Sequence, residues 1–399
     1  MASTKVKVSP IILKWARTSL HLTERDVVNH FLRKSKQKFG VDLAFLKDIE
    51  SNEREIRFTL LQELARLYKR PLSVFFLTKP PVELPPPKDR RTMESGVHRR
   101  MSSEAVLVLR RARFVQEAFI ELSEELNWNL SLPFKRMSLS DNPKELAGYF
   151  RRKFDFSFEI QKDKIRNYRE LFSTIRAKLE EVNVYTIKAS FPIEDARAFS
   201  LADKLPHLIV INNKDGGYFG YAPKSFSLVH EFAHILLREG ALCNNFVQPH
   251  QEVEKYCNEF AASFLVPDTE FIEVSPVSIS NFDKKKVEEY IEKLQKIFKV
   301  SKEVLLRKYL TLGFIDDAFY KKKISEWRER YEQREQNDVD KFLPIMTTAR
   351  RALNNNSRRF AELVLYAKRL GKITLDKAAD YLGISIKSLP EVEALLLNY

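Results

Sequence analysis

Five prolines stand within the eight residues 80–87, and this cluster constrains the fold more than any other local feature of the chain. Proline fixes φ and lacks an amide hydrogen, so neither a helix nor a central strand can run through the cluster. We therefore expect a stiff, extended linker at residues 80–92. The linker separates an N-terminal segment, residues 1–79, from the rest of the chain.

Composition favours a folded, helix-rich protein on both sides of the linker. Only ten of the 399 residues are glycine, which argues against β-sandwiches, and 44% are hydrophobic, which excludes a disordered chain. The net charge of +14 is spread over the chain and only weakly indicates a nucleic-acid partner. Two cysteines and the lack of a long apolar run lead us to expect a cytoplasmic protein that does not contact a membrane.

The N-terminal segment has the size and periodicity of a helix-turn-helix domain. Thr23 is placed to cap the second of its helices. Apolar residues recur at helical spacing in residues 11–20, 24–32, 41–49 and 58–68.

A basic run follows the second predicted helix and could contact DNA phosphates. Its cations are Arg33, Lys34, Lys36 and Lys38. With the helix at 41–49 in a major groove, these side chains would lie against the DNA backbone. A solvated protein surface is the alternative interpretation of the same residues.

Beyond the linker, three short β-patterns interrupt a series of helices. Alternating or β-branched residues at 182–188, 196–201 and 207–213 predict the strands of one small sheet. Helical periodicity covers most of the remainder, and Gly383 is placed to end a helix within 373–385. We therefore expect a mainly α protein with a small mixed β-sheet, that is, an α+β fold. The predicted domains after the linker are a core, a helical extension and a C-terminal helical domain, at residues 93–270, 271–340 and 341–399.

The sequence HEFAH at residues 230–234 carries the clearest chemical signal. We expect this sequence to lie within a helix at 225–238, because that stretch contains neither glycine nor proline. Because residues four apart lie on one helix face, His230 and His234 can both bind one Zn²⁺. Glu231 stands beside them, where a carboxylate can deprotonate a water molecule. A core helix with two incidental histidines is the alternative, and the cost of burying unpartnered imidazoles disfavours it.

A catalytic zinc needs a third protein ligand, and the next predicted helix, residues 251–266, offers three carboxylates. Glu254 shares a semi-buried face with Asn258, whereas Glu252 and Glu259 share a polar face. We therefore favour Glu254 as the ligand, with Asn258 one turn on as a partner for a metal-binding histidine.

Other donors stay open as alternatives. His250 or Cys257 could be the third ligand, although Cys257 falls on the apolar stripe of its helix. Cys243 could cap the metal as an inhibitory thiolate or be an ordinary cysteine. The candidates for stabilising the oxyanion of a tetrahedral intermediate are Tyr218, Tyr221 and His250.

These motifs resemble those of the ImmA/IrrE metallopeptidases. The segments FSLVHEFAHILL and EKYCNEFAASFLVP match the family's H-E-x-x-H motif and its following E-x-x-x-N/D-x-F-A motif. The stretches at 181–184 and 206–212 match the strands that precede them, and the helical patterns at 283–315 match the region that follows. The resemblance implies a gluzincin-like zinc endopeptidase core. In this core the base is Glu231 and the ligands are His230, His234 and Glu254.

Long members of that family carry an Xre-type helix-turn-helix domain before the protease, and the N-terminal segment resembles this arrangement. It departs from the usual pattern at Ile49 and Asn52, which replace a tryptophan and a glycine, and in the basic insertion at 33–40. We still expect the helix-turn-helix fold. The three departures argue against specific DNA recognition.

The expected function is a zinc endopeptidase that cleaves a regulatory protein, a repressor or antitoxin-like partner, in a stress response. An extended substrate could add as a strand at the edge formed by Ala196–Leu201. The alternatives are a helix-turn-helix, DNA-binding transcription regulator whose metal domain is a sensor, and a scaffold that only binds proteins. Glu231 favours the enzyme, because a structural metal site needs no base.

Overall fold

The computed structural model describes residues 4–33, 36–83, 101–216, 220–238, 250–275, 278–337 and 346–397. They fall into two compact units: residues up to 83 together with 101–111, and residues from 112 onward. The linker predicted at 80–92 lies mostly outside the described residues.

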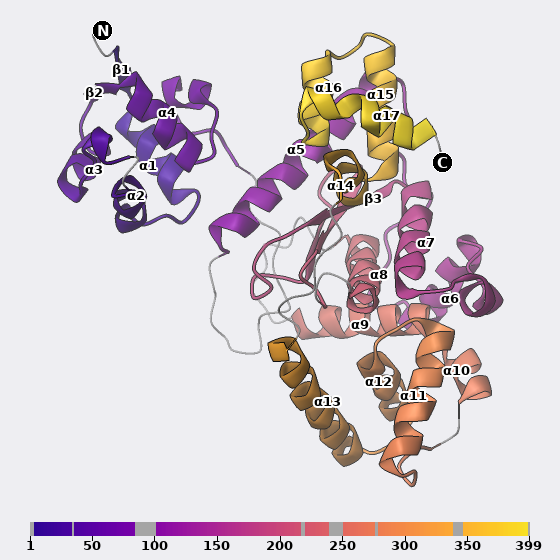
Figure 1. Ribbon diagram of the computed structural model, residues 1–399. Helices are drawn as coiled ribbons and strands as arrows, with labels where there is room; N and C mark the ends of the chain where they lie inside the picture. Colours follow the sequence, from indigo (N-terminus) through magenta and orange to yellow (C-terminus); the bar gives the residue numbers. More distant parts are fainter. Residues whose placement is uncertain are drawn as a thin grey trace. The chain divides into compact units, whose positions relative to one another are not determined.

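The first unit is a bundle of short helices with a two-stranded ribbon (Figure 1). The four predicted helices are present as α1 (Pro10–Thr18), α2 (Glu24–Phe31), α3 (Leu43–Ile49) and α4 (Phe58–Leu67). Thr23 caps α2 as predicted, since its side chain accepts a hydrogen bond from the Asp26 amide at 3.2 Å.

The antiparallel ribbon of β1 (Lys5–Val8) and β2 (Arg54–Arg57) was absent from the sequence-based prediction. Each strand has only four residues, and only Val8 and Ile56 are buried. The alternation in β1, KVKV, extends over only four residues, and β2, REIR, does not alternate, so the prediction missed both strands.

The second unit contains a three-stranded sheet at the predicted positions, with strand order β3-β5-β4. The strand β3 (Val184–Ala189) pairs in parallel with β5 (His207–Asn212), and β4 (Ala198–Leu201) pairs antiparallel with β5. The sheet is therefore mixed, as expected, and β4 is an outer strand. The prediction of a mainly α protein with one small mixed sheet in this region is confirmed, alongside the additional ribbon of the first unit.

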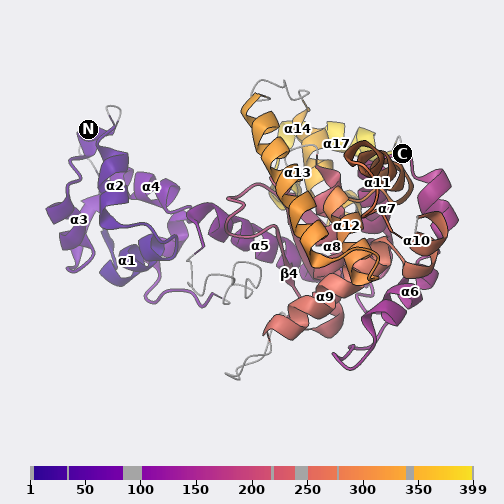
Figure 2. The same cartoon turned by 90° about the horizontal axis from the view of Figure 1, so that it is seen from below.

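Helices cover both faces of the sheet (Figures 1 and 2). Tyr185 of β3 contacts Phe119 of α5 on one face, with ring centroids 4.2 Å apart. Three residues along β3, Lys188 lies over Phe172 of α7 on the other face. The helices of the core are α5 (Ser103–Glu125), α6 (Pro143–Lys153), α7 (Tyr168–Glu181), α8 (Tyr221–Leu237) and α9 (His250–Leu265).

The helices beyond the core belong to the same unit. Those of the extension are α10 (Asp268–Val274), α11 (Lys284–Phe298), α12 (Lys302–Thr311) and α13 (Asp317–Asn337). Those of the C-terminal segment are α14 (Thr348–Asn355), α15 (Arg358–Arg369), α16 (Leu375–Leu382) and α17 (Leu389–Leu397).

The C-terminal helices pack on the core. Phe360 of α15 stacks on Phe119 of α5, with ring centroids 5.1 Å apart, and the Tyr381 hydroxyl donates to Glu121 Oε2 at 2.6 Å. Gly383 ends α16 in the left-handed conformation with φ of 67°, as predicted.

Candidate metal centre

The helix α8 carries the HEFAH sequence and is buried along most of its length. It begins at Tyr221, one turn earlier than expected, because Pro223 falls in its first turn, where a helix tolerates proline. His230 is fully buried and His234 is 8% exposed. The apolar residues of the helix pack into the core and leave the two imidazoles on one face.

The helix α9 packs directly against α8 in both views (Figures 1 and 2). Phe260 of α9 contacts Phe232 of α8, with ring centroids 6.1 Å apart. Val253 and Cys257 are fully buried on the same stripe, as predicted. This packing fixes the distance between the two helices and the direction in which Glu254 points.

Three side chains from α8 and α9 converge on one point. Nε2 of His230 and Nε2 of His234 are 3.1 Å apart. Glu254 Oε2 lies 3.3 Å from the first and Glu254 Oε1 lies 3.2 Å from the second. This set of two imidazoles and one carboxylate could hold a metal ion. We call it the His-His-Glu cluster.

The charges at the cluster suit a cation. Burial alone would raise the pKa of the Glu254 carboxyl, but the two histidines outweigh that effect and hold the pKa below its ordinary value. The carboxyl is therefore ionised at neutral pH. Its Oε1 atom is buried and accepts no hydrogen bond from any described residue. An ionised, buried oxygen without a donor is costly unless a cation meets it.

The neighbours of the cluster differ in how they match expectation. Glu231 is 5% exposed on α8, beside the two histidines in the sequence. Glu252 is exposed, as predicted. Asn258 is exposed too, and no hydrogen bond joins it to His230 or His234 in the described chain, so the structure does not give it the predicted histidine-orienting contact.

Tyr221 lies away from the cluster. It stands nine positions before His230 on one helix, a rise of about 13.5 Å. Its ring instead contacts Phe172 and lies under the ammonium groups of Lys188 and Lys224. The predicted oxyanion role of Tyr221 therefore finds no support in its position. Tyr218, Cys243 and the side chain of His250 lie outside the described residues.

The sequence-based prediction missed a buried hydrogen bond that holds the N-terminal half of α8. Ser227, one turn before His230, donates to Asp215 Oδ2 at 2.8 Å, and both residues are buried. Arg197 Nη1 also donates to Asp215, at 3.4 Å. The sequence indicated only a turn near Asp215, and no pattern linked it to Ser227. The bond ties α8 to the turn that follows β5.

The basic run of the first unit is only partly available to a ligand. Arg33 and Lys38 are exposed, and Lys34 lies outside the described residues. Lys36 instead donates to Glu63 Oε2 at 2.9 Å and to Nε2 of His30 at 2.8 Å. DNA binding through α3 stays a prediction.

Comparison with known proteins identifies the region around the cluster. Residues 179–309 match the family model Peptidase_M78, the IrrE N-terminal-like domain. The matched residues run from the end of α7 into α12 and include the whole His-His-Glu cluster. No curated protein and no solved structure was found to match the chain. None of the described helices is both long enough and apolar enough to span a membrane.

Proposed function

We propose that the protein is a zinc-dependent endopeptidase that cleaves a regulatory protein, because residues 179–309 match the family model of a metallopeptidase domain. A repressor or an antitoxin-like protein is the proposed substrate. The ligands in this proposal are His230, His234 and Glu254, and the general base is Glu231.

The observation that carries the proposal is the spacing of the His-His-Glu cluster. Tetrahedral zinc with bonds of about 2.05 Å separates its ligand atoms by about 3.3 Å. In the cluster the two Nε2 atoms are 3.1 Å apart, and each lies near a different oxygen of Glu254, at 3.3 Å for Oε2 and 3.2 Å for Oε1; with one ligand atom taken from each residue, all three atoms lie within 4.8 Å of one another. Two imidazoles and one carboxylate are also a donor set that catalytic zinc uses, with a fourth position left for substrate or water. The cluster therefore supports zinc as the metal.

Each neighbouring group has a distinct part in the proposed hydrolysis. Zinc held by His230, His234 and Glu254 would supply a Lewis acid that can polarise a peptide carbonyl and lower the pKa of a water molecule. Glu231 takes a proton from the attacking water and returns it to the leaving amine. In this proposal an extended substrate would add to the sheet as a further strand beside the outer strand β4, whose four residues are buried in the free protein.

The ligand assignment is tested by comparing two carboxylates on one helix. Glu254→Ala should lower the zinc content of the purified protein strongly, because it removes one of three ligands. Glu252→Ala is the matched control, since Glu252 is exposed two residues away. Zinc per chain is measured by atomic emission. Equal zinc content in the two variants would refute the assignment.

The catalytic assignment needs a variant that keeps the metal. Glu231→Gln should retain zinc and lower the rate of proteolysis by about 10²–10⁴, the usual effect of removing a general base. The same variant should trap uncut substrate in a pull-down, which supplies the protein for the rate assay. Wild-type cleavage rates in Glu231→Gln would show that another group is the base.

A further inference from the structure

A pocket in the first unit has a strongly one-sided charge. It lies at the C-terminal end of α4 and has a volume of about 440 Å³. Arg66, Lys69 and Arg70 line it together with Gln62, and none of its lining residues is acidic. We call it the α4 pocket.

The carboxylate nearest to Arg66 is already shared. Glu63 Oε1 accepts from Arg66 at 2.7 Å, while its other oxygen accepts from Lys36 at 2.9 Å. Lys69 is exposed, and no described residue forms an ion pair with it. On this side of the pocket there is therefore one carboxylate, Glu63, paired with two cations, and a third cation, Lys69, that has no ion pair with a described residue.

On the other side of the pocket, carboxylates are again fewer than cations. Glu83 Oε1 accepts from Arg70 at 2.5 Å and lies 3.4 Å from Nε of Arg110. Both guanidinium groups also donate to the Ser19 hydroxyl. The Arg70 Nε and Arg110 Nη1 atoms are buried and have no hydrogen-bond partner among the described residues.

The balance leaves an excess of three positive charges, because five cations share two carboxylates. The negative end of a helix dipole, about half a charge, attracts cations to the end of α4 but cannot offset this excess. The pKa values of neighbouring groups support the same picture. Burial, and then the charge of Arg70, lower the pKa of Arg110 to about 10. Burial, and then the cations around it, lower the pKa of His30.

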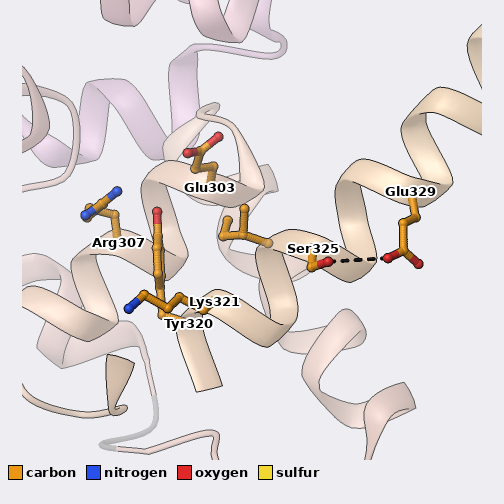
Figure 3. A pocket seen from close by; sticks show the side chains of 7 residues that line it. Glu303, Arg307, Tyr320, Lys321, Ser325 and Glu329 are labelled. Carbon is orange, nitrogen blue, oxygen red and sulfur yellow. Dashed lines mark hydrogen bonds between the residues drawn. The ribbon is translucent and has the colours of Figure 1, made fainter. Parts of the chain in front are cut away.

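A pocket of equal volume in the second unit lacks this asymmetry. It lies between α12 and α13 and also measures about 440 Å³ (Figure 3). Its lining includes the cations Arg307 and Lys321 and the carboxylates Glu303 and Glu329. Volume alone therefore does not single out the α4 pocket, but its charge does.

From this arrangement we propose that the α4 pocket binds a phosphate group. Guanidinium and ammonium groups are the side chains that bind phosphate most strongly, and Arg66 and Lys69 are the exposed cations of the pocket lining. The phosphate belongs either to a small phosphorylated molecule or to a nucleic-acid backbone. This proposal does not depend on the metal centre or on α3 entering a groove.

The test compares two double variants of the full-length protein. Arg66→Gln/Lys69→Gln removes two charges from the pocket. Lys14→Gln/Arg25→Gln is the matched control, because it removes two exposed charges of the same unit outside the pocket lining. Pyrophosphate binding is measured by isothermal titration calorimetry. Binding of a fluorescein-labelled 20-base-pair duplex is measured by anisotropy at several salt concentrations. Thermal melting checks that each variant folds. If the double pocket variant does not fold, the single variant Lys69→Gln takes its place in both binding assays.

We expect the pocket variant to bind pyrophosphate at least tenfold more weakly and the control to stay within twofold of wild type. If pyrophosphate displaces the duplex, the natural source is a nucleic-acid backbone, and the slope of log K against log salt should flatten by about 0.9 for each phosphate that the variant no longer neutralises. If the duplex is not bound or not displaced, the source is a small phosphorylated molecule. Equally weakened binding in the two variants, or no pyrophosphate binding by the wild type at millimolar concentration, would overturn the proposal.

Discussion

Replacing Lys188 by methionine should change how the stability of the second unit depends on pH. Lys188 lies on β3 with 4% of its surface exposed, and its ammonium donates to Asn354 Oδ1 at 2.6 Å. Burial lowers its pKa to about 7, and the positive charges of Arg176, Arg169 and Lys224 act in the same direction. Lys188 is therefore a titrating group in the neutral range, which an exposed lysine is not.

The sign and the size of the effect follow from that shift in pKa. In the unfolded chain Lys188 has its ordinary pKa of 10.5, so between pH 7 and pH 10.5 the unfolded state binds more protons than the folded state. Stability must then rise with pH across this window, by up to about 1.4 kcal/mol per pH unit. From pH 7 to pH 9 the gain is about 2 kcal/mol, because the group is already half titrated at the lower pH. Methionine cannot titrate, so Lys188→Met should lack this gain.

Urea unfolding followed by circular dichroism at pH 7, 8 and 9 measures the effect. The quantity of interest is the free energy of unfolding of the wild type minus that of Lys188→Met at each pH. Lys224, whose pKa burial lowers to about 8, is present in both proteins, so its own titration largely cancels in the difference. Lys214→Met, which changes an exposed lysine of the same unit, is the control. A difference that stays constant from pH 7 to pH 9 would refute the reasoning.

Two further predictions concern the metal and the first unit. Removing zinc with a chelator should destabilise the second unit by about 2.7 kcal/mol if zinc was present at a hundred times its Kd. Calorimetry should then show a lower Tm, and added zinc should restore it. A Tm that chelation leaves unchanged would contradict a bound metal. Arg17→Met should cost about 3–5 kcal/mol in hydrogen-exchange protection of α1 and α3, because Arg17 forms a buried two-bond ion pair with Glu50, at 2.7 Å for each bond. Arg54→Met, which breaks the exposed pair with Asp48, should cost much less, and equal destabilisation by the two variants would show that burial is not what matters.

Local rules were sufficient for much of the fold. The cap at Thr23 and the helix end at Gly383 depend on residues within one turn of each other, so the sequence predicts them directly. The face shared by His230 and His234 follows in the same way from helix geometry. The three strands of the sheet were predicted because their runs of β-branched and apolar residues are distinctive.

Contacts between distant residues were not accessible in this way. The ribbon pairs Val8 with Arg54 across 46 residues, and the sequence of neither four-residue strand predicts which strand it pairs with. The same holds for Lys36, which a local pattern placed in a DNA-binding run but which Glu63, 27 residues away, holds in an ion pair. Charge patterns identify a basic segment, whereas only the fold determines which of its charges already have partners.

In the candidate metal centre, too, local spacing predicted some features and tertiary packing decided the others. Spacing alone placed His230 and His234 together, but it left several third donors open, and it put Asn258 on a face that is in fact exposed. Glu254 reaches the two imidazoles because α9 packs against α8 through aromatic side chains of the core. The separation and rotation of two packed helices depend on all the side chains between them, so a one-dimensional pattern does not contain them. The sequence thus determined the helix that carries the histidines, and the tertiary packing decided which carboxylate meets them.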